Sequence, residues 1–181
     1  MQRTLTIVLA ASALAACETA GPSGPPPPER PSGPAYTPPS AGGAEAFRDS
    51  DFAWSTGSGG GAIQGVLAFK GPSGHYTCQD VVLAPETPWS RARMRVLYLS
   101  TTAAAMPADD VRARTPPEHG NEYARYARHA TCDALGHFSF ANLPGGAWYA
   151  ITVATPDGGG TRMAVMRRVE VHGDTVKVLL R

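Results

Sequence analysis

The sequence predicts an all-β sandwich of about seven strands with one short inserted helix, formed by residues 47–181. Three observations support this fold class. Short segments alternate apolar and polar residues, as half-buried strands do. Turn residues such as Gly, Pro, Asn and Asp separate these segments at regular intervals. The segment of about 135 residues is long enough to bury one core of its own.

Seven segments carry a strand pattern and end in turn residues. In the last of them, Val176, Val178 and Leu180 share one face while Lys177 takes the other. The predicted strands are 62–69, 76–84, 123–132, 137–143, 148–154, 163–171 and 175–180.

Residues 87–100 form the exception and predict a short helix. Thr87 can cap the helix, and Pro88 can occupy its first position. Apolar and long side chains then recur at helical spacing: Trp89, Arg93, Met94, Val96, Leu97 and Tyr98. A strand over 95–99 is the alternative, and residues 101–120 predict a loop because they show little periodicity.

The amino terminus predicts export and lipid anchoring. Arg3 precedes an apolar stretch, residues 5–14, which is too short to span a bilayer and has the length of a signal-peptide core. The stretch runs into Leu-Ala-Ala-Cys ending at Cys17, which resembles the lipobox of bacterial lipoproteins. That resemblance implies a signal peptide over 1–16, a diacylglyceryl group on the thiol of Cys17, and anchoring to a membrane through this lipid. An ordinary signal peptide cut after Ala16 is the alternative.

Residues 17–46 predict a solvated tether. Nine of the seventeen prolines lie between Pro22 and Pro39, and large apolar residues are almost absent. Such a segment buries too little surface to offset its conformational entropy.

The expected location is the cell envelope, on the outer membrane and facing the periplasm.

The charge balance argues against a nucleic-acid partner. Without residues 1–16 the chain has 15 Lys and Arg residues and 15 Asp and Glu residues, because only Arg3 is lost. A nucleic-acid partner would require a basic face, so none is expected.

Two cysteines remain besides the lipidated one. An even number in an oxidising compartment predicts a disulfide between Cys78 and Cys132. Each also belongs to a His-x-x-Cys sequence, with His75 and His129, so a tetrahedral zinc site is one alternative and two free thiols are the other. Residues three apart on a strand point to opposite faces, which disfavours metal.

The sequence predicts no catalytic residues, no resident metal and no cofactor. It lacks a Gly-x-Ser-x-Gly elbow, and His119 and His137 lie in a loop and a turn where histidines are usually solvated. Trp89, Tyr123 and Tyr126 form a candidate ligand surface, since aromatic side chains can stack on a sugar or peptide. Core packing is the alternative use of these aromatic residues.

A further motif lies at 133–146, which reads Asp-x-x-Gly-x-Phe-x-Phe-x-x-Leu-Pro-Gly-Gly and leads into 148–151. Together with 65–69 and 78–85, it resembles the carboxypeptidase regulatory-like domain. The resemblance covers about 62–153 and implies a transthyretin-like (prealbumin-like) Greek-key β-sandwich. It implies a fold without an activity, because in that family catalysis belongs to a separate peptidase domain.

These observations favour a non-catalytic, membrane-anchored envelope lipoprotein whose sandwich is a binding or structural module, with an envelope protein or a glycan as the expected partner. The first alternative is a module that binds a glycan or peptidoglycan fragment through Trp89 and Tyr123. The second alternative is a small metal-site or hydrolytic protein that uses His75, His129 and the two thiols.

Overall fold

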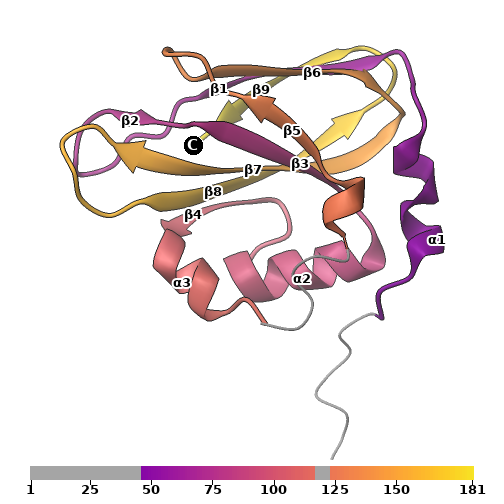
Figure 1. The fold of residues 1–181 in the computed structure, drawn as a ribbon, viewed down its shortest axis with the longest axis horizontal. Helices are drawn as coiled ribbons and strands as arrows, with labels where there is room; N and C mark the ends of the chain where they lie inside the picture. Colours follow the sequence, from indigo (N-terminus) through magenta and orange to yellow (C-terminus); the bar gives the residue numbers. More distant parts are fainter. Residues whose placement is uncertain (1–45, 117–122) are drawn as a thin grey trace, which may run out of the picture. The chain divides into compact units, whose positions relative to one another are not determined.

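The computed structural model describes residues 46–116 and 123–181. The predicted signal peptide, the lipidation site at Cys17, the tether up to residue 45, and His119 lie outside these described residues. Nine strands form two sheets that pack face to face, so the predicted β-sandwich is confirmed (Figure 1).

The first sheet has three strands in the order β6–β1–β9. Strand β1 (Gly61–Leu67) lies in the middle, antiparallel to β6 (His137–Leu143) and parallel to β9 (Thr175–Leu180). The first, fourth and last of the predicted strands therefore become neighbours in one sheet.

The second sheet has six strands. Its main path runs in the order β4–β8–β7–β3–β5, and the short β2 pairs with β7. The bounds are β2 Tyr76–Thr77, β3 Asp80–Pro85, β4 Ala103–Pro107, β5 Arg128–Thr131, β7 Gly146–Pro156 and β8 Met163–Val171.

The main core fills the space between the two sheets. Phe138 and Phe140 on β6 are buried, as the alternation of their strand predicts. A Cβ on Gly65 would lie 2.1 Å from the ring of Phe138, so this position in β1 must be glycine for the ring to cover the strand. Other fully buried members include Ile63, Val81, Leu83, Trp148, Val165 and Leu180.

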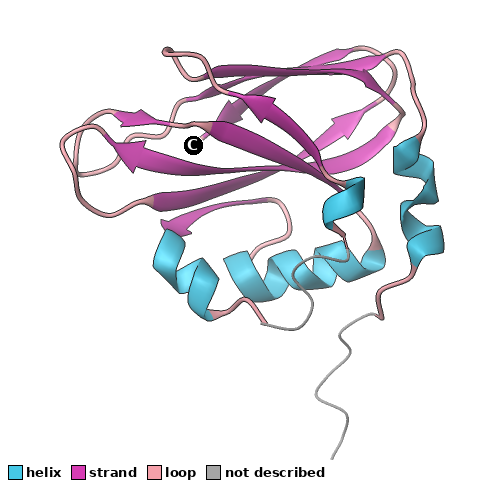
Figure 2. Cartoon of the chain, viewed as in Figure 1, coloured by secondary structure: helices cyan, strands magenta, loops and turns pink. Residues whose placement is uncertain are grey.

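A helical layer covers the other face of the second sheet (Figure 2). Helix α2 (Pro88–Tyr98) and helix α3 (Ala108–Ala113) pack with Tyr149 and Met166 into a second core. Because this sheet is covered on both faces, consecutive residues of β7 such as Trp148 and Tyr149 are both buried. None of the helices in the described ranges is long and apolar enough to cross a membrane.

The helix predicted over 87–100 is confirmed as α2, which excludes the alternative strand over 95–99. Thr87 caps it and Pro88 stands at its start, as expected. The helical spacing placed Val96 with Leu97 on the packed side of the helix, and this was wrong for Val96, which is 56% exposed. Met94, Leu97 and Tyr98 are the residues that reach the core.

Three other predictions were partly wrong. The loop expected over 101–120 contains β4 and α3, since a short alanine-rich strand on a sheet edge has no periodicity to reveal it. The strand expected over 123–132 is shortened to β5 because a 3-10 helix, η2 (Ala124–Tyr126), precedes it. The strand expected over 76–84 divides into β2 and β3. Helix α1 (Asp49–Phe52) and the 3-10 helix η1 (Ala53–Thr56) were not predicted.

The predicted disulfide is confirmed. Cys78 lies just before β3 and Cys132 just after β5, with their Cα atoms 5.8 Å apart. These two strands pair from Asp80 opposite Thr131, so the bond closes the end of their ladder. The helical layer lies in the chain between β3 and β5, and the disulfide therefore braces the two strands from which this insertion departs.

Candidate aromatic ligand-binding site

The three aromatic residues that the sequence suggested as a ligand surface lie together at one end of the sandwich. Trp89 and Tyr123 have ring centroids 5.4 Å apart. Phe52 stacks on Tyr126 at 4.7 Å, and Phe47 meets Trp89 edge to face at 5.3 Å. We call these five side chains, Phe47, Phe52, Trp89, Tyr123 and Tyr126, the aromatic cluster.

Trp89 is positioned by the start of helix α2. The side chain of Thr87 accepts a hydrogen bond from the backbone N–H of Ser90, and the Ser90 hydroxyl accepts one from the backbone N–H of Thr87. This reciprocal capping box satisfies backbone donors that would otherwise be unpaired. The Ser90 hydroxyl also donates to the carbonyl of Pro85, which fixes the helix start to the end of β3.

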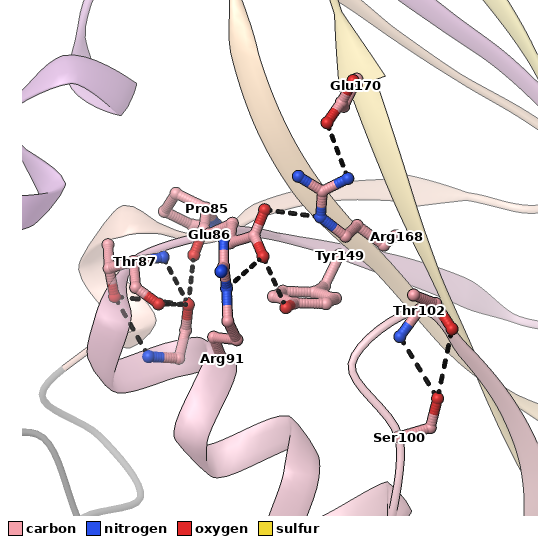
Figure 3. A network of polar contacts seen from close by, with 10 residues as sticks. Pro85, Glu86, Thr87, Arg91, Ser100, Thr102, Tyr149, Arg168 and Glu170 are labelled. Atoms are coloured by element: carbon pink, nitrogen blue, oxygen red, sulfur yellow. Dashed lines mark hydrogen bonds and ion pairs between the residues drawn. The ribbon is translucent and has the colours of Figure 1, made fainter.

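A buried carboxylate holds α2 against the sheet (Figure 3). Glu86 has a side chain only 5% exposed, and its oxygens accept hydrogen bonds from Arg91 Nε at 2.8 Å and Arg168 Nε at 2.6 Å. The hydroxyl of Tyr149 donates to the same carboxylate at 2.9 Å. Burial and this contact raise the pKa of the Tyr149 hydroxyl. Glu86 thus joins α2, β7 and β8, with two cations to balance its charge.

Two arginines lie over rings of the aromatic cluster. The guanidinium carbon of Arg93 is 5.4 Å from the ring centroid of Trp89 and 5.5 Å from that of Tyr123. Arg125 lies 5.0 Å from the ring centroid of Tyr126. Such contacts place positive charge over the negative face of an aromatic ring. The Nε of Arg93 is buried and has no hydrogen-bond partner among the described residues.

Asp49 ties the N-terminal segment to the rest of the cluster. Its carboxylate accepts hydrogen bonds from Arg125 and, at 2.9 Å, from the hydroxyl of Tyr126. The hydrogen bond from Arg125, followed by that from Tyr126, lowers the pKa of the Asp49 carboxyl. Helix α1 is thereby held against η2, and Phe47 and Phe52 join rings from later parts of the chain.

The aromatic cluster is neither fully core nor fully surface. Phe52 is completely buried, whereas Phe47, Trp89, Tyr123 and Tyr126 are half-buried. Half-buried rings can stack on the apolar face of a ligand, while nearby hydroxyl and guanidinium groups bond its polar atoms. This combination suits a ligand with both apolar faces and hydroxyl groups.

The residues of the alternative metal site are not brought together. Both cysteine sulfurs are consumed by the disulfide, and His75 Nδ1 bonds Asp157 at 2.8 Å. His129 is exposed on β5. Within the two described ranges, no group of three or more His, Cys, Asp or Glu side chains could hold a metal ion. The exposed His137 pairs with Asp133 at 3.0 Å in the turn before β6.

The sequence did not reveal Phe47, Phe52, Asp49 and Arg125 as members of the cluster. The only signal was the pair of phenylalanines before the glycine-rich stretch, with two acidic residues between them. Their role depends on contacts with α2 and η2, which are distant in the chain and cannot be deduced from local patterns.

No protein-family model matches this chain, and no curated protein matches its sequence significantly. Among solved structures, the chain is similar to a candidate carbohydrate-binding protein from Pseudomonas aeruginosa, determined by crystallography. The two share 26% sequence identity with a TM-score of 0.55, and the match covers 75% of this chain and 97% of the other. This likeness supports the β-sandwich fold.

Proposed function

We propose that this protein is a lipid-anchored, glycan-binding module of the bacterial cell envelope. The observation that carries the proposal is the convergence of Trp89, Tyr123 and Tyr126 into one half-buried aromatic cluster, with Arg93 and Arg125 over its rings. Sugar rings have apolar C–H faces and hydroxyl edges, so they suit a surface of this composition. The similar protein from Pseudomonas aeruginosa, described as a candidate carbohydrate binder, supports the same ligand class.

The anchor belongs to the proposal as well. The Leu-Ala-Ala-Cys sequence ending at Cys17 supports lipidation, and the proline-rich residues 18–46 support a spacer between lipid and sandwich. In this account the module faces the periplasm from the outer membrane and samples glycans within the reach of its tether. Growth with a labelled fatty acid tests the anchor, because the label should enter the wild-type chain and not a Cys17→Ala variant.

We also propose that the sandwich is a carboxypeptidase regulatory-like domain. Asp133 accepts hydrogen bonds from the backbone N–H groups of Leu135 and His137, and Gly136 adopts a positive φ of 78°, as the turn of the carboxypeptidase regulatory-like motif requires. Gly146 has a φ of 150°, and a Cβ there would lie 2.4 Å from the ring of Trp54. These roles are structural and agree with a module that binds without catalysis.

Co-sedimentation with insoluble glycans tests the binding function. The full chain in detergent is mixed with peptidoglycan sacculi, chitin or cellulose, and bound protein is measured in the pellet. We expect wild type to bind at least one of these polymers and Trp89→Leu to bind less. Val96→Ala, on the exposed side of the same helix, is the matched control and should bind as wild type does. Equal binding by wild type and Trp89→Leu would overturn the proposed site.

A further inference from the structure

A groove lies on the outer face of the first sheet, the face opposite the main core. Its volume is about 930 Å³, within the range of about 300–1,000 Å³ that small-molecule sites occupy, and it is widely open to solvent. It is lined by side chains of all three strands and by Thr131 and Asp133 at its rim. We call it the sheet groove, and it shares no residue with the aromatic cluster.

A row of polar side chains crosses the sheet groove. Gln64 on the central β1 lies opposite Ser139 on β6 and opposite Lys177 on β9. All three are exposed, and neighbouring strands lie about 4.8 Å apart, so the row spans about 10 Å between its outer Cα atoms. Among the residues that the structure describes, none provides a hydrogen-bond or ion-pair partner for these three side chains. The row therefore offers an amide, a hydroxyl and an ammonium group to a ligand.

A second, more apolar row runs beside the first. Val66, two residues further along β1, lies opposite His137 on β6 and Leu179 on β9. Leu179 is 48% exposed, so its side chain is accessible to a ligand. The two rows are about 7 Å apart along the strands. A polar strip beside an apolar strip matches the hydroxyl edge and the C–H face of one sugar ring.

The sheet groove holds one carboxylate, Asp133, and one ammonium group, Lys177, and only the carboxylate has partners among the residues that the structure describes. Asp133 is already engaged by the side chain of His137 and by the backbone N–H groups of Leu135 and His137. These contacts, led by the backbone N–H of His137, lower the pKa of the Asp133 carboxyl. Lys177, in contrast, has no anionic partner within the described ranges. An anionic group of a ligand would satisfy this ammonium group.

We infer that the sheet groove is a second ligand site, which binds a saccharide that carries a carboxylate. The carboxylate pairs with Lys177, the ring hydroxyls bond Gln64 and Ser139, and the apolar face of the ring lies on Val66 and Leu179. The inference does not rest on the proposed site at the aromatic cluster, because the two sites are built from different residues.

The lysine content of the chain makes the test specific. Lys70 and Lys177 are the only two lysines, so reductive methylation with ¹³C-formaldehyde gives two side-chain NMR signals besides that of the amino terminus. Methylation keeps the positive charge. Titration of the full chain in detergent with trigalacturonate should shift the Lys177 signal and leave that of Lys70 in place. Equal shifts of both signals, or no shift, would overturn the inference.

Two comparisons complete the test. Lys177→Met should lower the affinity for trigalacturonate about tenfold, because it removes a charge-assisted hydrogen bond, while Lys70→Met should bind as wild type does. Neutral galactotriose should bind wild type more weakly than trigalacturonate. Equal affinity for the acidic and neutral sugars, or an unaffected Lys177→Met variant, would refute the role of the ammonium group. The Lys177 signal should still shift in a Trp89→Leu variant, so failure at the sheet groove is distinct from failure at the aromatic cluster.

Discussion

The ring centroids of Trp89 and Tyr123 lie 5.4 Å apart, with the guanidinium group of Arg93 over both rings. Trp89 opens helix α2, whereas Tyr123 follows β4 and α3 in the chain and precedes η2. The inserted segment therefore leaves the second sheet and returns to it at the aromatic cluster. Its two ends supply the rings that we assign to glycan binding.

Replacing these rings should weaken glycan binding in a graded way. Trp89→Leu and Tyr123→Leu each remove one stacking face, and we expect each to cost about 0.5–1.5 kcal/mol, or about 2- to 13-fold in affinity. Tyr123→Phe keeps the ring and should lose less. Isothermal titration calorimetry with a soluble fragment of whichever glycan binds measures the differences. An unchanged Kd in both leucine variants would be inconsistent with stacking at this site.

The buried ring of Phe52 should stabilise the folded domain by supporting the other rings of the aromatic cluster. Its side chain is completely buried against Trp89 and Tyr126, so Phe52→Ala should lower the free energy of unfolding by about 3–5 kcal/mol. Chemical denaturation followed by fluorescence measures this loss. Val96→Ala, which alters an exposed side chain of α2, should change it by no more than about 0.5 kcal/mol. Similar effects of the two substitutions would show that Phe52 is not anchored as described.

The negative charge of Glu86 should contribute more to the stability of the domain than the packing of its side chain. Glu86→Gln leaves Arg91 without a carboxylate partner and Arg168 with Glu170 as its remaining one, and we expect a loss of about 3 kcal/mol in the free energy of unfolding. A second substitution, Arg168→Met, should cost less in the Glu86→Gln background than in the wild type, because the ion pair with Glu86 is already lost. Denaturant melts of the two variants and the double variant form the necessary cycle. Strict additivity of the two losses would contradict a direct coupling.

The stability of the domain should fall in acid. The hydrogen bonds that Asp49 receives from Arg125 and Tyr126, and those that Asp133 receives from His137 and Leu135, lower the pKa of both carboxyls below the value of the unfolded chain. Their contribution is therefore complete above the unfolded pKa of about 3.9 and is lost as the pH falls through the lower folded pKa. Melting curves between pH 7 and pH 2 should show this decline. Asp49→Asn should flatten it, and an equally steep decline in that variant would contradict the assignment.

The disulfide should stabilise the strands that flank the insertion. Reduction, or the double substitution Cys78→Ala with Cys132→Ala, should lower the free energy of unfolding by about 2–5 kcal/mol. The β3–β5 end of the second sheet should lose hydrogen-exchange protection before β1 does. Mass spectrometry of the unreduced chain checks the bond itself. Two free thiols in protein isolated from its native compartment would contradict the expected oxidation.

Much of the fold was predictable because its signals are local. The alternation of Phe138 and Phe140 located β6, and Thr87 followed by Pro88 located the start of α2. Strand β4 was not predictable, because a short edge strand of alanines pairs with β8 without a periodicity of its own. The second core could not be predicted from the sequence either. Consecutive apolar residues in β7 do not reveal that the layer over the far face of the sheet is made of helices.

The candidate sites were predictable only in part. Trp89, Tyr123 and Tyr126 attract attention as aromatic residues near polar segments, but Phe47 and Asp49 join them through long-range contacts. The sheet groove depends on β1 lying between β6 and β9, and this order aligns three polar side chains from distant parts of the chain. Each residue alone reads as an ordinary outward position on a strand.

The indole N–H signals of the three tryptophans provide the most direct test of glycan binding at the aromatic cluster. Trp89 is half-buried in that cluster, whereas Trp148 is completely buried in the main core and Trp54 packs against it. In a ¹⁵N NMR titration of the full chain with soluble peptidoglycan fragments and chitooligosaccharides, we predict that at least one ligand shifts the Trp89 signal and leaves the Trp148 signal in place. A glycan that binds without moving the Trp89 signal, or the absence of binding to any of them, would contradict the account.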